Sequence, residues 1–255
     1  MKVDFFANLQ QSIIKSPLII LVVFALTQIF LIYKIFVNHQ VIFSGDCALF
    51  FECAKRLLLG QLPYVDFIEH NPPLIYYFNL IPAWFHLQFN LSADLVFLYY
   101  MVIITTLIFI FSYKILVNAK LQFSIYQTFL IAIVLFNITV LETYGQREHI
   151  IVLLIIPFMI VRSLRFENYA ISKLTAILAG ILAGIGLSIK PWYTILILFY
   201  DITWAIITKQ YKLFLAKEAQ ALILTIFVYI LHFLFLPRIE IGSYFNFDTF
   251  SLSCF

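Results

Sequence analysis

Charged residues are scarce in this chain, because Asp, Glu, Lys and Arg make up only 11% of its 255 residues. A soluble domain carries about 25% charged residues, so this sequence has too few to cover a surface that faces water. Cysteine is also scarce, and three cysteines at positions 47, 53 and 254 make no disulfide framework. With only 7 glycines and 64% hydrophobic residues, a collagen-like fibre and a disordered chain are excluded as well.

Long uncharged runs fill most of the chain instead. They cover 16–33, 71–93, 95–113, 121–141, 150–161, 174–189, 219–237 and, interrupted only by Asp201, 191–208. A spanning helix needs about 20 mostly apolar residues, whereas the strands of a membrane β-barrel alternate apolar and polar residues. The sequence therefore predicts an all-α polytopic membrane protein with membrane lipids as partners. A net charge of +3 is too small to indicate a nucleic-acid partner.

The run at 71–93 decides the predicted topology. It contains Pro72, Pro73 and Pro82, which disfavour one straight helix. We interpret it as a re-entrant or interfacial part of a long first outer loop, 38–92. About seven transmembrane helices then remain, at 17–37, 93–117, 121–141, 148–164, 173–189, 192–208 and 218–237.

Basic residues set the predicted orientation. With a cytoplasmic N-terminus, ten Lys and Arg residues fall on the inner side and six on the outer side, in agreement with the positive-inside rule. If 71–93 spanned the membrane, eight of those ten would lie outside. We therefore expect a multi-pass protein of the cell membrane, the bacterial inner membrane, with the first loop and the active site on the periplasmic side. Nine of the thirteen acidic residues fall on this outer side as well.

The first outer loop opens with an amphipathic pattern at 46–59. Asp46 stands where a helix cap is expected and Gly60 where the helix should stop. The loop continues through a stretch rich in polar and proline residues, which suits a lid or platform on the membrane surface. Asp46 is either a helix cap or a functional acid. The other polar residues of the loop, Asp66, Glu69 and His70, are either solvated loop residues or part of a site.

Two further polar segments fall on the predicted outer side. Residues 142–149 hold Glu142, Arg147, Glu148 and His149, and such groups at a membrane boundary are costly unless they are paired or functional. Arg147 and Glu148 either pair with other groups, or Arg147 faces a pocket, where its planar fork suits a phosphate. Lys190 either extends to the headgroups or neutralises a lipid phosphate.

Two features of the later helices have mainly structural interpretations. Small residues at four-residue spacing in 173–189 let helices approach closely. Asp201 lies inside the apolar run 191–208. Its position near the inner end indicates a pair with Lys209 or a backbone cap, although an intramembrane acid is also a candidate for function.

The order of these motifs resembles a known family. Asp46 after the first span, then Gly-x-x-Pro-Tyr-x-Asp-Phe at 60–67 and Pro-Pro-Leu at 72–74, is similar to membrane-embedded lipid-linked glycosyltransferases of the GT-C fold. Among them, the chain resembles the protein O-mannosyltransferase family (glycosyltransferase family 39) and the bacterial aminoarabinose transferases of lipid A. The segment 144–150 and Lys190-Pro191 add to the resemblance, which covers about 1–240.

Two departures from the family pattern accompany this resemblance. The aminoarabinose branch has a lysine before its Pro-Pro, where this chain has His70-Asn71. Family members also usually continue through more spans. We therefore expect a membrane-embedded glycosyltransferase-like module at 1–240 and a short tail at 241–255 that truncation leaves.

The resemblance implies transfer of a sugar, with inversion, from a polyprenyl-phosphate-linked donor to an acceptor hydroxyl at the outer face. It implies that Asp46 is the general base, while the acceptor itself (a lipid, a glycan or a protein) is not readable from the sequence. Arg147, Lys190 and His70 are expected to bind the donor phosphate. Glu148 and Glu142 are expected to orient Arg147 or the acceptor. Tyr64, Asp66 and Glu69 are expected to make acceptor or loop contacts.

Other classes of function stay open beside this one. The chain is alternatively a non-catalytic membrane subunit, a transporter, or an inactive fragment of a split glycosyltransferase. A transporter is disfavoured because no two halves share a pattern. No cofactor is expected and no metal-ligand spacing is present, although Asp46 with Glu148 offers an alternative site for a divalent ion.

Overall fold

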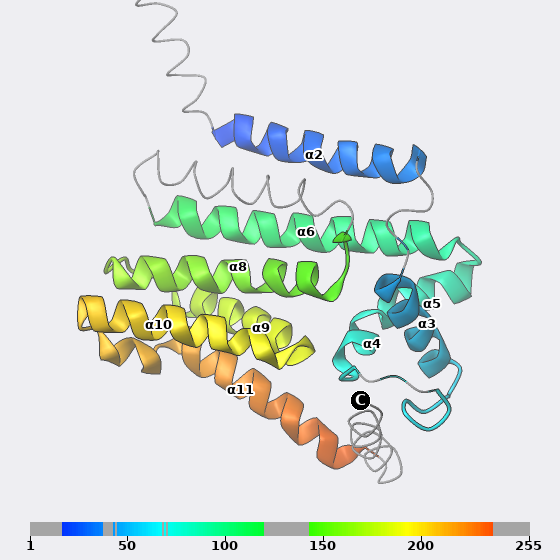
Figure 1. Ribbon diagram of the computed structural model, residues 1–255. Helices are drawn as coiled ribbons and strands as arrows, with labels where there is room; N and C mark the ends of the chain where they lie inside the picture. The colour runs from blue at the N-terminus through cyan, green and yellow to red at the C-terminus, as the bar shows by residue number, and fades with distance from the viewer. Residues whose placement is uncertain are drawn as a thin grey trace, which may run out of the picture.

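The computed structural model describes residues 17–37, 43, 45–67, 69, 71–119 and 143–236 (Figure 1). Within these residues every regular element is helical, and the nearest approach to a sheet is an isolated bridge between Pro63 and Phe67. The predicted all-helical class is therefore confirmed. The elements are α2 (Pro17–Val37), α3 (Asp46–Leu58), α4 (Leu74–Phe78), α5 (Leu80–Phe89), α6 (Ala93–Asn118), α8 (Arg147–Phe166), α9 (Lys173–Ile189), α10 (Thr194–Thr208), α11 (Lys217–His232) and the 3-10 turns η2 (Pro191–Tyr193), η3 (Tyr211–Leu215) and η4 (Phe233–Phe235).

Four segments are long and apolar enough to cross a membrane. They are Ala93–Asn118, Arg147–Phe166, Pro191–Thr208 and Lys217–Phe235. Shorter apolar helical segments occur at Leu21–Phe30 and Lys173–Ile189. The chain is thus a helical membrane protein. The predicted span at 121–141 and the tail at 241–255 lie outside the described residues.

The long helices lie side by side, and α3, α4 and α5 gather at one end of them (Figure 1). This end, called the platform end below, is where α6 and α8 begin and where α9 and α11 finish. The proline-rich run 71–93 forms two short helices that meet at Asn79, whose amide bonds back to the Ile75 carbonyl at 2.8 Å. Neither short helix is long enough to span a membrane.

Helix α3 is bounded as its sequence predicts at one end only. Gly60 takes a positive φ of 85° directly after the helix, which is the conformation that ends many helices. At the start, Gly45 precedes the helix and Asp46 is its first residue, with no side-chain cap bond. The cap interpretation of Asp46 is therefore wrong, because its carboxylate is directed to another helix.

Small residues bring α9 against α11, as the four-residue spacing predicts. A Cβ added at Gly180 would lie 2.8 Å from the Ala221 Cβ, and one at Gly184 would lie 2.6 Å from the Thr225 Cβ. Only glycine fits at such a separation. Lipid supplies no hydrophobic force between helices, so close packing of this kind carries much of their association.

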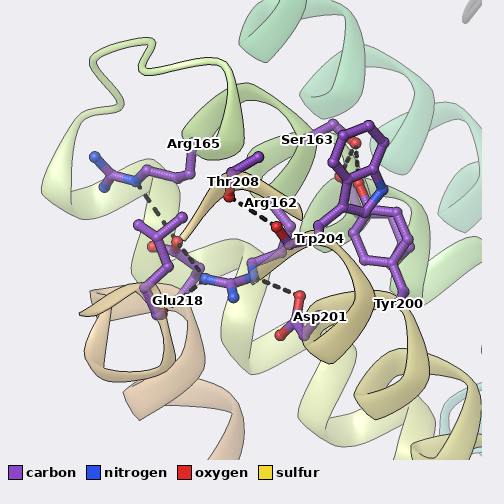
Figure 2. A network of polar contacts seen from close by, with 10 residues as sticks. Arg162, Ser163, Arg165, Tyr200, Asp201, Trp204, Thr208 and Glu218 are labelled. Atoms are coloured by element: carbon purple, nitrogen blue, oxygen red, sulfur yellow. Dashed lines mark hydrogen bonds and ion pairs between the residues drawn. The ribbon is translucent and has the colours of Figure 1, made fainter. Parts of the chain in front are cut away.

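A buried ionic cluster joins α8 to α10 and α11 at the end of the bundle away from the platform (Figure 2). Arg162 Nε lies 2.9 Å from Asp201 Oδ1, its Nη1 lies 3.4 Å from Glu218 Oε1, and Arg165 also faces Glu218. Arg162 and Glu218 are fully buried. The expected pairing of Asp201 with Lys209 is wrong, because Lys209 takes a left-handed conformation directly after α10 while Asp201 faces α8.

Candidate functional site

Arg147 is the first residue of α8 and lies at the platform end. Gly145 turns the chain into this helix with a φ of 80°, and a Cβ there would lie 2.5 Å from the nearest atom of the Phe97 ring. Glycine is thus required both for the turn and for the close approach. The turn sets the first residues of α8, Arg147 and Glu148, beside the start of α3.

Asp46 and Arg147 form an ion pair between α3 and α8. Arg147 Nη2 donates to Asp46 Oδ2 at 3.0 Å, and the guanidinium carbon lies 5.0 Å from the centre of the buried Phe50 ring. The Asp46 side chain is 45% exposed, against 17% for Arg147. A carboxyl group that is open to solvent is thus fixed against a guanidinium that is largely enclosed.

A second ion pair lies one residue further along α8. Lys190 Nζ, directly after α9, donates to Glu148 Oε1 at 2.5 Å and lies 6.0 Å from the Tyr193 ring centre. Both side chains are about one-third exposed. Two carboxylates and two cations therefore meet where three helices reach the platform end.

The negative charges of Asp46 and Glu148 also act on a neighbouring thiol, that of Cys47. Cys47 is buried, and its Sγ donates to the Tyr144 carbonyl at 3.7 Å. Burial, with smaller contributions from the negative charges of Asp46 and Glu148, raises the pKa of Cys47 to about 12. The thiol is thus kept protonated beside the ion pair.

The chain between α3 and α4 reaches this site through Asn71. Its Oδ1 accepts from Arg147 Nη1, and its Nδ2 donates to Glu69 Oε1 at 2.6 Å. Tyr64, another predicted loop residue, takes a φ of 64° and donates its hydroxyl to the Asn71 carbonyl at 2.6 Å. Glu69 and Tyr64 are therefore linked to Arg147 through Asn71.

Of the three remaining predicted residues, the structure describes only Asp66, which lies apart from the ion pairs. Asp66 Oδ2 accepts from the Leu62 amide at 2.7 Å within an exposed turn of the loop. His70 and Glu142 lie outside the described residues. Of the sequence-predicted set, the structure brings together Asp46, Arg147, Glu148, Lys190, Glu69 and Tyr64.

Two residues of the site carry no predicted role there, although the sequence places His149 in a polar segment that is either paired or functional. Asn71 was noted only as a departure from a lysine, although an amide directly before two prolines is held in an extended conformation and is thus well fixed. His149 is buried and accepts from the Gly145 amide at 3.0 Å through Nδ1, while its ring contacts Tyr144. It therefore stabilises the turn into α8.

Metal ligation has no clear candidate in the part of the chain that the structure describes. No group of three or more His, Cys, Asp or Glu side chains there lies close enough to share an ion. Asp46 and Glu148 each face a cationic side chain. A divalent ion between these two acids remains a prediction.

An apolar cavity opens between α6 and α9, with α8 behind it. Its volume is about 630 Å³, and Phe78 of α4 contributes to its lining. The walls carry only hydrophobic side chains, including Ile104, Ile108, Leu154, Leu182 and Ile185. The cavity thus runs from the depth of the apolar helices towards the platform.

Chemically, the site combines an exposed carboxylate that can accept a proton with two cations that can bind an oxyanion. The apolar cavity, whose described lining contains none of these charged residues, can receive an apolar chain. Comparison with models of protein families, with curated proteins and with solved structures finds no match to this chain.

Proposed function

We propose that this protein is a membrane-embedded glycosyltransferase that uses a polyprenyl-phosphate-linked sugar as donor. The observation that carries the proposal is the convergence of Asp46, Arg147, Glu148 and Lys190 at one end of the helical bundle. These residues come from three helices and are separated by up to 144 positions in the chain. A lipid carrier places its phosphate at the headgroup plane, where such a cluster of charges would meet it.

The proposed orientation places the platform end outside the cell, with seven spans and a cytoplasmic N-terminus. Basic residues support it, because seven lie towards the other end, on helices or turns that the structure describes: Lys114, Arg162, Arg165, Lys173, Lys209, Lys212 and Lys217. The platform end holds five, namely Lys34, Lys55, Arg56, Arg147 and Lys190. Cytoplasmic segments carry the excess of Lys and Arg.

The proposed reaction is a single displacement with inversion. The acceptor oxygen forms a bond to the anomeric carbon as the bond from that carbon to the phosphate oxygen breaks. The hydroxyl proton passes to Asp46, and the polyprenyl phosphate leaves with the bonding electron pair. Arg147 and Lys190, joined by His70, would stabilise the charge that develops on the phosphate, while Glu148 and Glu142 would orient Arg147 or the acceptor.

The apolar cavity supports a lipid-linked donor. A soluble sugar nucleotide would have no use for a wholly hydrophobic cavity of about 630 Å³ between membrane helices. An isoprenoid chain lying there would enter from the lipid side, with its phosphate towards α4 and the first outer loop. Acceptor contacts are then left to the loop residues Tyr64, Asp66 and Glu69.

Asp46→Asn tests the proposed base. The amide keeps the size of the side chain and its contact with Arg147 but accepts no proton, so we expect transfer to fall by about 10²-fold or more. The assay follows transfer of labelled sugar from a polyprenyl-phosphate donor in membranes. Glu52→Gln, an exposed residue of the same helix, is the matched control and should keep full activity. Full activity of Asp46→Asn would exclude Asp46 as the base.

A second candidate is a non-catalytic membrane subunit. The observation that favours it is that Arg147 and Lys190 are each already paired with a carboxylate. Under this alternative the ion pairs only hold helices together. The same assay decides between the two, because a non-catalytic subunit releases no sugar from the labelled donor in any variant.

A further inference from the structure

Asn71 connects the first outer loop to the ion pair between α3 and α8. Arg147 Nη1 donates to its Oδ1, and its Nδ2 donates to Glu69 Oε1 at 2.6 Å. Its backbone carbonyl accepts the hydroxyls of Tyr64 at 2.6 Å and of Tyr76 at 2.9 Å. Tyr76 is fully buried. Both the main chain and the side chain of Asn71 are therefore fixed.

The chemistry of these contacts allows only one orientation of the amide. A guanidinium has donors and no acceptor, whereas an ionised carboxylate has acceptors and no donor. The oxygen of Asn71 must therefore face Arg147 and its nitrogen must face Glu69. Pro72 adds to this constraint, because it restricts the preceding residue to extended backbone. An aspartate at position 71 would keep the acceptor and lose the donor.

We infer that Asn71 is a positioning residue, which links Glu69 to Arg147 and holds the guanidinium against Asp46. Phe50 lies against the guanidinium, and Asp46 binds one of its terminal nitrogens. Asn71 binds the other terminal nitrogen and so removes the freedom to swing that a long arginine side chain would keep. The catalytic consequence of this inference rests on the proposed function, whereas the structural link does not.

The test exchanges the hydrogen-bond donor and the acceptor between positions 71 and 69. Asn71→Asp places a carboxylate beside Glu69, so the two groups repel each other and the contact between them is lost. Adding Glu69→Gln restores a donor on that side, because the Gln amide can donate to the new carboxylate while Arg147 still donates to it. Net charge is the same in the double variant as in the parent. Loss in the single variant and recovery in the double variant would show that the link itself matters.

The first measurement needs no enzyme activity. In a Cys53→Ala, Cys254→Ser background, Cys47 is the only thiol, and it is buried directly beside Asp46. We expect maleimide to label Cys47 faster in Asn71→Asp than in the parent, by about tenfold or more, because α3 and α8 open more often. The double variant should return to the parent rate. Glu52→Gln, outside the network, should label at the parent rate.

The second measurement is the transfer assay. We expect kcat of Asn71→Asp to fall by about 10–100-fold, since misplacing a catalytic group by 1 Å costs about 10²-fold. KM for the donor should change less, and the double variant should regain most of kcat. A residue that merely packs would give the same defect in both variants, and that result would overturn the inference.

The two measurements separate the two proposals. One outcome is that Cys47 labelling rises in Asn71→Asp and returns to the parent rate in the double variant, while the parent transfers no sugar. Asn71 then positions Arg147 as inferred, and the glycosyltransferase proposal fails. If Cys47 is labelled at the parent rate in Asn71→Asp, the positioning inference is overturned whatever the transfer activity.

Discussion

At the scale of single residues, the site depends on side chains that gain partners from distant parts of the chain. Asp46 begins α3, yet its carboxylate meets Arg147 of α8 at 3.0 Å. Lys190 follows α9 and meets Glu148 at 2.5 Å. Exposed ion pairs contribute little to stability, so these pairs are better explained by the orientation they impose than by the energy they add.

The buried thiols give a prediction at this scale. Burial raises the pKa of both Cys47 and Cys53 to about 12. In a Cys254→Ser variant at pH 8 the thiolate fraction of each is then about 10⁻⁴, and the thiolate is the reactive form. We expect almost no labelling by maleimide in the folded protein and rapid labelling of both after unfolding in detergent. Fast labelling of the folded variant would contradict their burial.

The same pKa values determine how stability depends on pH. A thiol in the unfolded chain loses its proton near pH 8.5, well before the folded thiols do. The unfolded state therefore binds fewer protons above this pH, and the free energy of unfolding should fall as the pH rises from about 8.5 towards 12. Replacing both thiols by alanine should remove this part of the slope in an unfolding titration.

Members of the site could be predicted from the sequence where their residue type is rare among the surrounding residues. Asp46, Arg147 and Lys190 stand out because charge is scarce, and the structure brings them to one end. Asn71 does not stand out, because a neutral amide in a loop carries no signal until its partners are known. Asp201 was given the wrong partner because sequence distance favours Lys209, whereas the helix packing selects Arg162.

At the scale of helices, close packing and buried ion pairs, in place of the hydrophobic effect, hold neighbouring helices together. Helices α9 and α11 approach through Gly180 and Gly184, and α10 is held to α8 by polar contacts. Besides Arg162 with Asp201, the hydroxyls of Ser163 and Tyr200 lie 2.8 Å apart (Figure 2). The glycine pattern was readable from the sequence, but the ionic cluster was not, because the two acids lie 39 and 56 residues from Arg162.

The glycine contact predicts a loss of stability. In Gly184→Ala the new methyl group would meet Thr225 and the backbone of α11, so we expect the free energy of unfolding to fall by about 1–3 kcal/mol. Unfolding by SDS in mixed micelles measures it. Leu174→Ala, at an exposed position of the same helix, is the control. Equal stability of the two variants would contradict the close approach.

The ionic cluster predicts a larger loss that further substitution reverses. Arg162→Met leaves Asp201 buried without a cation and leaves Glu218 with Arg165 alone, and breaking such a buried pair costs about 3–5 kcal/mol. The triple variant Arg162→Met, Asp201→Leu, Glu218→Leu removes all three charges and should regain most of the stability. The same unfolding assay measures both variants. A triple variant as unstable as the single one would show that the charges themselves are needed.

At the scale of the whole molecule, seven described basic residues lie towards the end opposite the polar site, against five at the platform end. The membrane class followed from composition, because so few charged residues cannot cover a soluble surface, and the helical class followed from the continuous apolar runs. The number of spans did not follow in the same way. Four described segments are long enough to cross a membrane, whereas α9 has only 17 residues and depends on its neighbours to be accommodated.

The proposed orientation predicts which positions face outwards. In a cysteine-free background, Gln61→Cys lies in the first outer loop and Lys212→Cys lies in η3 at the other end. A maleimide that cannot cross membranes should label position 61 in intact cells and position 212 only after permeabilisation. The reverse pattern would place the platform end in the cytoplasm and end the proposal of an outer active site.

The sequence separation of the Asp46–Arg147 contact has a consequence for biosynthesis. During translation α3 leaves the ribosome 101 residues before its partner does, and Lys190 follows its own partner Glu148 by 42 residues. The first helix of the platform therefore has no cationic partner for Asp46 until α8 has been made. A nascent chain stopped before Arg147 would leave Asp46 without its cation, and one that extends beyond Lys190 would complete both ion pairs.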